Sequence, residues 1–235
     1  GEKVSDIMRR HSSAAGAVIS GGRGDDAFVA TGGGHTYKYS RADGQDTITE
    51  TRNVDPITGL PAAASRIVFG SDIVSGDVSL AVDNGLALRI GPTAGDTVRL
   101  VNFDPQNALD PLPAVDRFEF ADGTALTMAE LLARGFDFAG TSGDDSIAGT
   151  SVVDRFAASA GNDTLSGGGG ADVYHLASAS GLDVIVDTAA AGSGDDTLRV
   201  SVGTQPSDAT FLRSGSDLVV RDATGVNRVI VQGHY

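Results

Sequence analysis

A nine-residue period is the feature of this chain that most constrains its fold. From residue 140 the sequence reads GTSGDDSIA, GTSVVDRFA, ASAGNDTLS and GGGGADVYH. The sixth position of each nonapeptide is an aspartate: Asp145, Asp154, Asp163 and Asp172. The eighth position is always bulky and apolar: Ile147, Phe156, Leu165 and Tyr174. A short, strict period is typical of a repeat architecture in which each unit stacks on its neighbours.

A shorter run with the same pattern lies earlier in the chain. GGRGDDAFV at residues 21–29 places Asp26 and Phe28 in register, and the following ATGGGHTYK keeps Tyr37 but carries His35 at the sixth position. The acidic residues of the chain are 27 Asp and only 4 Glu, and there are 32 Gly. Asp and Gly favour turns over helix interiors, so the composition indicates a turn-rich β protein. For any single Asp, a simple turn-forming role is the alternative to metal binding.

These nonapeptides resemble the G-G-x-G-x-D-x-U-x repeat of the RTX (repeats-in-toxin, haemolysin-type calcium-binding) proteins. The resemblance implies an all-β fold, a right-handed parallel β-roll, present twice in this chain. It also implies calcium as the bound ion.

The physical chemistry of the repeat agrees with this fold. The glycine-rich half can bend the chain, and x-U-x forms a three-residue strand whose central side chain points inward. Two nonapeptides then make one coil, so that every second turn stacks at about 4.8 Å. Stacked carboxylates repel by roughly 3 kcal/mol at an effective dielectric near 20. A hard cation with six to eight oxygen ligands turns that repulsion into a binding site.

The resemblance also implies ligand sets, in which backbone carbonyls join the aspartates of two stacked turns. The first predicted site uses Thr141, Gly143 and Asp145 with Ala158, Ala160 and Asp163. The second uses Thr150, Val152 and Asp154 with Gly167, Gly169 and Asp172. Asp183 and Asp196 are predicted to complete two more sites with Asp163 and Asp172, and Asp26, with Gly22 and Gly24 in its turn, is predicted to pair with Asp46.

A longer duplication divides the chain into predicted domains at residues 1–135 and 136–235. YKYSRADGQDTITE at residue 37 matches YHLASASGLDVIVD at residue 174, and alternating strands are expected at 66–69, 78–82, 86–90 and 97–101. DRFEFADGTALTMAELLARG resembles the strand and helix of the haemolysin-type calcium-binding related domain. Thr127 and Glu130 predict a capping box for that helix. Each roll is therefore expected to be extended by strands and a short capping helix.

The sequence begins and ends at points within this repeating pattern rather than at the borders of a complete unit. VSDIMRR at residue 4 looks like a second copy of the helix, and the chain stops at Tyr235, where the strand after the second roll is expected. Either a longer array continues in both directions, or copies of this chain supply the missing strand.

Several classes of protein are excluded by what the sequence lacks. A net charge of −14 with only 2 Lys opposes nucleic-acid binding, and no apolar run is long enough for a membrane span. There is no Cys, and no H-E-x-x-H, G-x-S-x-G or phosphate-loop motif, so no catalytic residues are predicted and the chain is not expected to be an enzyme.

The expected function is that of a calcium-binding structural module. Its family resemblance implies an extracellular, type I-secreted protein that folds when it binds calcium outside the cell. Two alternatives remain open. The chain could be a building block of a calcium-dependent surface layer, adhesin or filament that binds copies of itself, or the non-catalytic C-terminal part of a secreted hydrolase or toxin.

Overall fold

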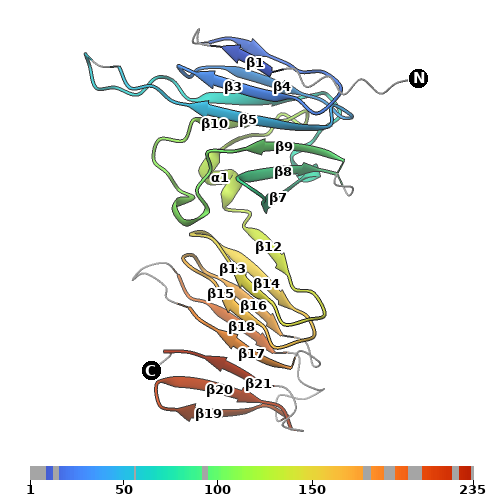
Figure 1. Cartoon of the computed structure of the whole chain (residues 1–235), viewed down its shortest axis with the longest axis vertical. Coiled ribbons are helices and arrows are strands. Elements are labelled where there is room, and N and C mark those ends of the chain that lie inside the picture. The colour runs from blue at the N-terminus through green and yellow to red at the C-terminus, as the bar shows by residue number, and fades with distance from the viewer. Residues whose placement is uncertain are drawn as a thin grey trace. The chain divides into compact units, whose positions relative to one another are not determined.

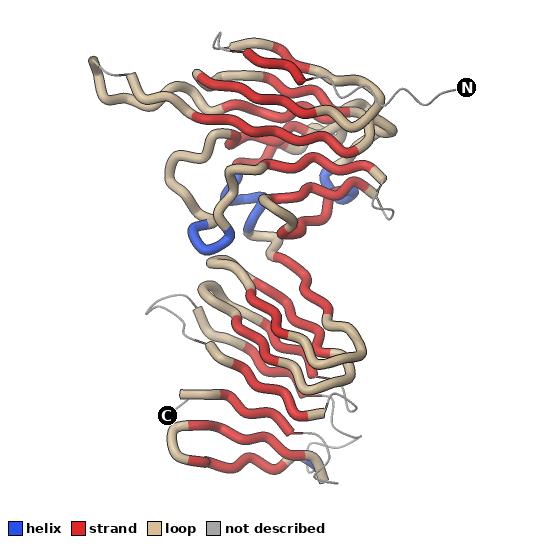
Figure 2. The backbone as a smooth tube through the Cα atoms, viewed as in Figure 1, coloured by secondary structure: helices blue, strands red, loops and turns tan. Residues whose placement is uncertain are grey.

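The computed structural model describes residues 9–12, 16–55, 57–91, 95–176, 181–187, 194–200, 208–223 and 228–233. The chain divides into two compact units, one formed within residues 1–105 and 109–134 and the other within residues 106–108 and 135–235. Both units are built mainly from strands joined by turns and loops, as Figure 2 shows. This arrangement confirms the predicted all-β fold.

Two sheets face each other in the first unit (Figure 1). One has the strand order β1 (Arg9–Ser12), β3 (Ala27–Thr31), β5 (Gln45–Thr51), β9 (Asp96–Leu100), β8 (Leu86–Ile90) and β7 (Val78–Val82). The other has the order β11 (Ala125–Thr127), β10 (Val115–Glu119), β6 (Ser65–Phe69), β4 (Thr36–Tyr39) and β2 (Val18–Ile19). Strands from β1 to β6 alternate between the sheets and pair in parallel with the next strand but one, which is the predicted roll.

The second unit repeats this plan. Its four-stranded sheet is β12 (Phe136–Ala139), β14 (Asp154–Ala158), β16 (Val173–Leu176) and β18 (Thr197–Val200). The six-stranded sheet is β13 (Ser146–Ala148), β15 (Thr164–Ser166), β17 (Leu182–Ile185), β21 (Arg228–Val231), β20 (Asp217–Arg221) and β19 (Thr210–Ser214). Ile147 lies beside Leu165, and Phe156 beside Tyr174. Every second nonapeptide therefore stacks, as the period predicted.

An antiparallel meander extends each roll. In the first unit β7, β8 and β9 pair in turn, and β9 joins the roll beside β5. In the second unit β19, β20 and β21 do the same beside β17. The bounds predicted for β7 and β8 agree with the structure, and those for β6 and β9 differ by one residue at one or both ends.

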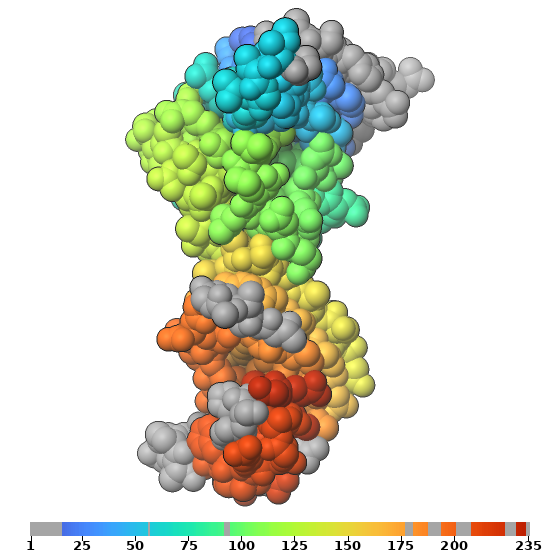
Figure 3. All heavy atoms as spheres, turned by 90° about the vertical axis from the view of Figure 1, so that its left-hand side faces the viewer, coloured from blue at the N-terminus to red at the C-terminus, as the bar shows by residue number. Residues whose placement is uncertain are grey.

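The eighth-position side chains form the core of the second roll. Phe156 and Leu165 are at most 1% exposed, and Tyr174 is 2% exposed. The rings of Phe138, Phe156 and Tyr174 stack at centroid distances of 5.3 and 5.0 Å. In Figure 3 the atoms of the second unit are drawn as spheres in yellow to red. The aromatic column thus runs along the roll in the same register as the aspartates.

Short helical segments lie next to the strands. The helix α1 (Met128–Leu132) begins at Thr127, whose hydroxyl accepts from the backbone N–H of Glu130, and the Glu130 carboxylate accepts from the backbone N–H of Thr127. This capping box was predicted. Two 3-10 turns are η1 (Ser75–Asp77) and η2 (Pro105–Asn107). None of the helices in the described ranges is long and apolar enough to cross a membrane.

Two helix predictions need correction. The first unit has its helix, but the second contains no α-helix among its described residues. The helix predicted at VSDIMRR does not include Arg9 and Arg10, which pair with Ala27 and Phe28 as the edge strand β1. Strand pairing on an open sheet edge outweighs local helix propensity there. Residues 1–8 lie outside the described part of the chain.

We expect Phe156→Ala to lower the free energy of unfolding in saturating calcium by about 3–5 kcal/mol, because it empties the centre of the stacked column. Chemical unfolding followed by circular dichroism measures this loss. Phe211→Ala is the control, since Phe211 is 63% exposed and its truncation is expected to change stability by less than about 0.5 kcal/mol. Equal effects of the two substitutions would contradict the assigned core.

Candidate metal centre

The sixth-position aspartates form two ladders along the second roll. The backbone N–H of each aspartate donates to the carboxylate of the aspartate two turns further on. In one ladder Asp145 donates to Asp163 (2.9 Å) and Asp163 to Asp183 (3.1 Å). In the other Asp154 donates to Asp172 (2.8 Å) and Asp172 to Asp196 (2.9 Å). The structure therefore brings together all the aspartate pairs predicted for this unit.

The first unit retains one such pair. The backbone N–H of Asp26 donates to Oδ1 of Asp46 at 3.1 Å, and both residues are buried. The neighbouring turn carries His35, whose backbone N–H donates to the hydroxyl of Ser65 at 2.8 Å. Ser65 therefore takes the place that the next aspartate has in the second unit. The first unit therefore has one aspartate pair of one ladder. His35 and Ser65 stand where the other ladder has aspartates.

Burial makes the ladders electrostatically costly. Asp154, Asp163, Asp172 and Asp183 are each at most 1% exposed, whereas Asp145 is half-buried and Asp196 is exposed. Burial raises the pKa of Asp154 to about 6. It raises the pKa of Asp172 and of Asp46 to about 7, with nearby carboxylates adding to the shift. A proton or a cation that neutralises these carboxylates therefore stabilises the folded chain.

Glycines at the first position of the repeat make room for the carboxylates. A Cβ at Gly149 would lie 2.4 Å from Oδ2 of Asp154 and 2.5 Å from the carbonyl oxygen of Gly167. A Cβ at Gly167 would lie 2.2 Å from Oδ2 of Asp172. Neither glycine has a positive φ, so their role is steric rather than conformational. Positive φ occurs at other glycines of the turns, including the predicted ligands Gly22 and Gly24.

Threonine hydroxyls hold two of the aspartates. Thr141 donates through its backbone N–H and its hydroxyl to Asp145, and Thr150 does the same to Asp154. Sequence reasoning assigned only the carbonyl groups of these threonines. The carbonyl oxygen of Thr150 accepts from the backbone N–H of Gly169 at 3.0 Å, which places two predicted ligand turns side by side.

The other predicted carbonyl donors lie in or beside these turns. The carbonyl of Val152 accepts from the Thr150 hydroxyl at 3.4 Å, and Gly143 donates its N–H to the Thr141 hydroxyl at 3.2 Å. Ala158 is buried at the end of β14, and Ala160 is exposed in the turn that follows. Whether these carbonyls bind an ion stays a prediction.

Two carboxylate oxygens lack the hydrogen bonds that the threonines supply elsewhere. Oδ2 of Asp163 and Oδ2 of Asp172 are buried and have no hydrogen-bond partner in the part of the chain that the structure describes. Neither turn has threonine at its second position, which is Ser159 in one and Gly168 in the other. Buried carboxylates without partners are strongly disfavoured, and a cation removes that penalty. A donor set made only of oxygens fits calcium.

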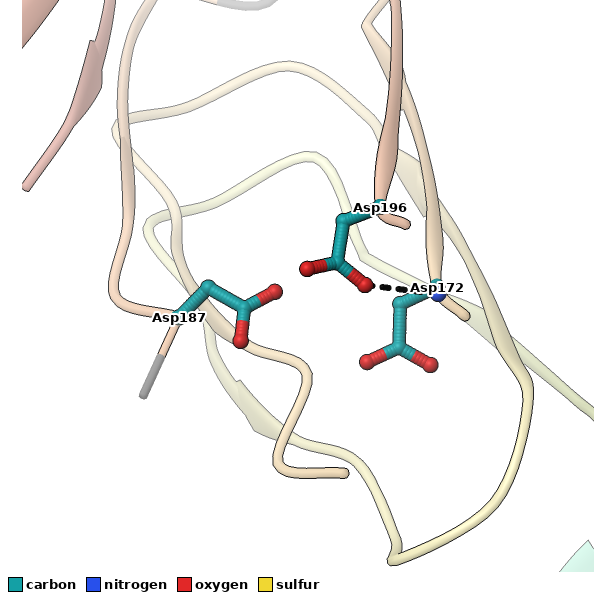
Figure 4. Close-up of side chains that lie close together, drawn as sticks. All are labelled: Asp172, Asp187 and Asp196. Carbon is teal, nitrogen blue, oxygen red and sulfur yellow. Dashed lines mark hydrogen bonds between the residues drawn. The ribbon is translucent and has the colours of Figure 1, made fainter. Parts of the chain in front are cut away.

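One acidic residue at this centre was missed by sequence reasoning. Asp187 lies outside the nine-residue register, yet one of its carboxylate oxygens is within 4.8 Å of oxygens of Asp172 and Asp196. Figure 4 shows the three carboxylates converging from two sides. A signal was present in the sequence, because the duplicated segments beginning at Tyr37 and Tyr174 both end in an acidic residue, Glu50 and Asp187.

Comparisons with known proteins identify this type of turn. Residues 149–178 match the family model described as RTX calcium-binding nonapeptide repeat (4 copies). The match confirms the predicted resemblance: the second unit carries RTX calcium-binding repeats, and the chain contains an RTX-type calcium-binding module.

The other comparisons add less. No curated protein matches the chain. Among solved structures, the extracellular lipase LipA from Serratia marcescens is similar at 15% sequence identity and a TM-score of 0.31. That alignment covers 92% of this chain, which spans only 36% of the lipase chain. A likeness this weak carries no argument about function.

We expect Gly149→Ala to destabilise the calcium-loaded protein by about 1–3 kcal/mol, because the new methyl group collides with backbone as well as with Asp154. Gly143→Ala is the matched control in the preceding turn. Its Cβ would meet only the Thr141 hydroxyl, at 3.9 Å, and a change below about 0.5 kcal/mol is expected. Thermal or denaturant unfolding of both variants measures the difference, and a stable Gly149→Ala protein would refute the steric role.

In calcium-free protein we expect stability to fall as the pH rises from about 4 to about 7. The pKa values of Asp46, Asp154 and Asp172 are raised in the folded chain, so in this range the folded state binds more protons than the unfolded state. Protonation then replaces part of the neutralisation that calcium provides. Circular dichroism after complete calcium removal should show more β structure at pH 5 than at pH 7.5. The reverse order would contradict the assignment.

Proposed function

We propose that this chain is a calcium-binding structural module of an extracellular, type I-secreted RTX-type protein, and that it folds on binding calcium outside the cell. The observation that carries this proposal is the pair of buried, unpartnered carboxylate oxygens on Asp163 and Asp172, at the centre of a stretch that matches the RTX repeat. Without a cation, the roll must close with those charges desolvated.

The calcium gradient across the cell envelope supplies the switch in this proposal. Extracellular calcium modules bind at about 0.1–1 mM, so cytosolic calcium is too low to load them. Millimolar calcium outside adds on the order of 1 kcal/mol for each site. Asp163 and Asp172 each belong to two rungs of a ladder, so binding at one rung favours binding at the next. Several linked sites together then decide whether the roll folds.

The module is proposed to be structural rather than enzymatic. The polar groups that the structure gathers are carboxylates, threonine hydroxyls and turn carbonyls, which is a donor set for a hard cation. The candidate site therefore stabilises a fold. Under this proposal the chain is the non-catalytic part of a larger secreted protein, such as the tail of a hydrolase or toxin.

The main test is the response of the fold to calcium. We expect the β-sheet signal in circular dichroism to be lost on chelation at neutral pH and restored by excess calcium. Magnesium should not restore it, because it demands a tighter octahedral geometry. An unchanged spectrum after calcium removal would refute the proposal.

A substitution in the ladder sharpens this test. Asp163→Asn keeps an acceptor for the Asp145 N–H but removes the buried charge, so the calcium concentration at half-folding should rise several-fold. Asp137→Asn is the control, because Asp137 is exposed and pairs with Arg155 at the surface. That variant should fold at the calcium concentration of the unchanged protein.

A second candidate function is self-assembly into a surface layer or filament. Among the described strands, β18 ends the four-stranded sheet, whereas its counterpart β6 in the first unit pairs on that side with β10. An open strand edge is a template for strand addition by another chain. Light scattering of the calcium-loaded protein at high concentration tests this, and a monomer there would count against it.

A further inference from the structure

The convergence of Asp172, Asp187 and Asp196 brings together both sheets of the second roll. Asp172 and Asp196 precede strands β16 and β18 of one sheet, and Asp187 follows strand β17 of the other. The repeat register accounts for the first two residues but not for the third. Because Asp187 lies outside the nine-residue register, this group of three aspartates differs from the other aspartate pairs of the ladders.

The contacts of the three side chains leave oxygens directed at a common point. Asp196 uses Oδ1 to accept from the backbone N–H of Asp172 at 2.9 Å, and Asp187 uses Oδ2 to accept from the hydroxyl of Tyr174 at 2.8 Å. Oδ2 of Asp172 and Oδ1 of Asp187 are both buried, and neither has a hydrogen-bond partner among the described residues. Asp172 itself is only 1% exposed. The remaining oxygens of the three carboxylates therefore face one another (Figure 4).

The distances suit a calcium ion. One oxygen from each of the three carboxylates lies within 4.8 Å of the other two. Two oxygens bound to one calcium ion, each at about 2.3–2.6 Å, are at most about 5 Å apart. The carboxylates can thus share one ion without a large movement of the backbone.

The first unit provides a natural comparison at the equivalent place. Tyr37 donates its hydroxyl to Glu50 at 2.9 Å across the same 13-residue separation that joins Tyr174 and Asp187. The other oxygen of Glu50 accepts from the hydroxyl of Ser65 at 2.5 Å. His35 and Ser65 occupy the positions of Asp172 and Asp196. A single carboxylate with a donor on each oxygen needs no cation.

We infer that Asp172, Asp187 and Asp196 form a calcium site that closes the end of the second roll, and that hydrogen bonds from Tyr37 and Ser65 to Glu50 replace this site in the first unit. The inference rests on the proposed function and adds a ligand from outside the nonapeptide repeat. The ion ties the segment after β17 to the turn before β18. The two halves of the duplication consequently differ in their demand for calcium.

Calcium stoichiometry of the whole chain, measured by equilibrium dialysis, tests this inference. Asp187→Asn should bind one calcium ion fewer than the unchanged protein. Glu50→Gln is the matched control at the equivalent place in the first unit, and it should leave the number of ions unchanged. An unchanged number in Asp187→Asn, or the loss of an ion in Glu50→Gln, overturns the inference. If the unchanged protein binds no calcium, the proposed function itself fails.

A second measurement covers the case in which Asp187→Asn does not fold. Terbium replaces calcium in oxygen sites and emits when a nearby tyrosine absorbs light. Tyr174→Phe keeps all three carboxylates, and it should lower sensitised terbium emission while retaining the calcium stoichiometry of the unchanged protein. Tyr37→Phe should keep the emission. Equal emission from Tyr174→Phe and the unchanged protein overturns the inference.

Discussion

The stacking of aspartates at the spacing of β-strands is the constraint on which the rest of this structure depends. The backbone N–H of each sixth-position aspartate donates to the carboxylate two turns further on, and this bond fixes the register of the roll while it buries a charge. Repulsion between such carboxylates is unavoidable at this spacing. Every turn must therefore contain something that compensates it, and different turns of the chain use different groups.

Three kinds of compensation occur in the two units. Threonine at the second position donates two hydrogen bonds to the aspartate of its own turn, as Thr150 does to Asp154. Where that threonine is absent, buried oxygens of Asp163 and Asp172 have no hydrogen-bond partner among the described residues, and a cation is the proposed compensation. In the first unit, Glu50 is held by hydroxyl groups and its neighbours are not carboxylates. The sequence of each turn thus determines whether its carboxylate is met by hydrogen bonds from its own turn.

Packing and electrostatics are coupled through the nine-residue period. The sixth position lies at or just before the start of each strand and the eighth lies two residues later within it, so the aspartate ladder and the aromatic column rise together with each turn. Phe156 stacks on Tyr174, and Tyr174 in turn donates its hydroxyl to Asp187. Under the proposed function, neutralising the ladder and consolidating the core are therefore expected to occur together.

The sequence alone determined the features that repeat with a fixed period. The alternation of aspartate and apolar residues predicted the parallel roll and each aspartate pair, and period-two patterns predicted strands β7 and β8 with their bounds. Local chemistry predicted the capping box of Thr127 and Glu130. These features could be predicted because both partners lie in one register or within a few residues of each other.

Only the tertiary structure decided the contacts between residues of the nonapeptide repeat and residues outside it. Asp187 reaches Asp172 from the opposite sheet, and Ser65 replaces an aspartate beside His35 at a separation of 30 residues. Arg9 and Arg10 become an edge strand because β3 offers unpaired backbone groups, although their local sequence resembles a helix. The nine-residue period specifies which nonapeptides stack on one another. The packing of the two sheets against each other specifies which side chains from outside the repeat lie beside the aspartates.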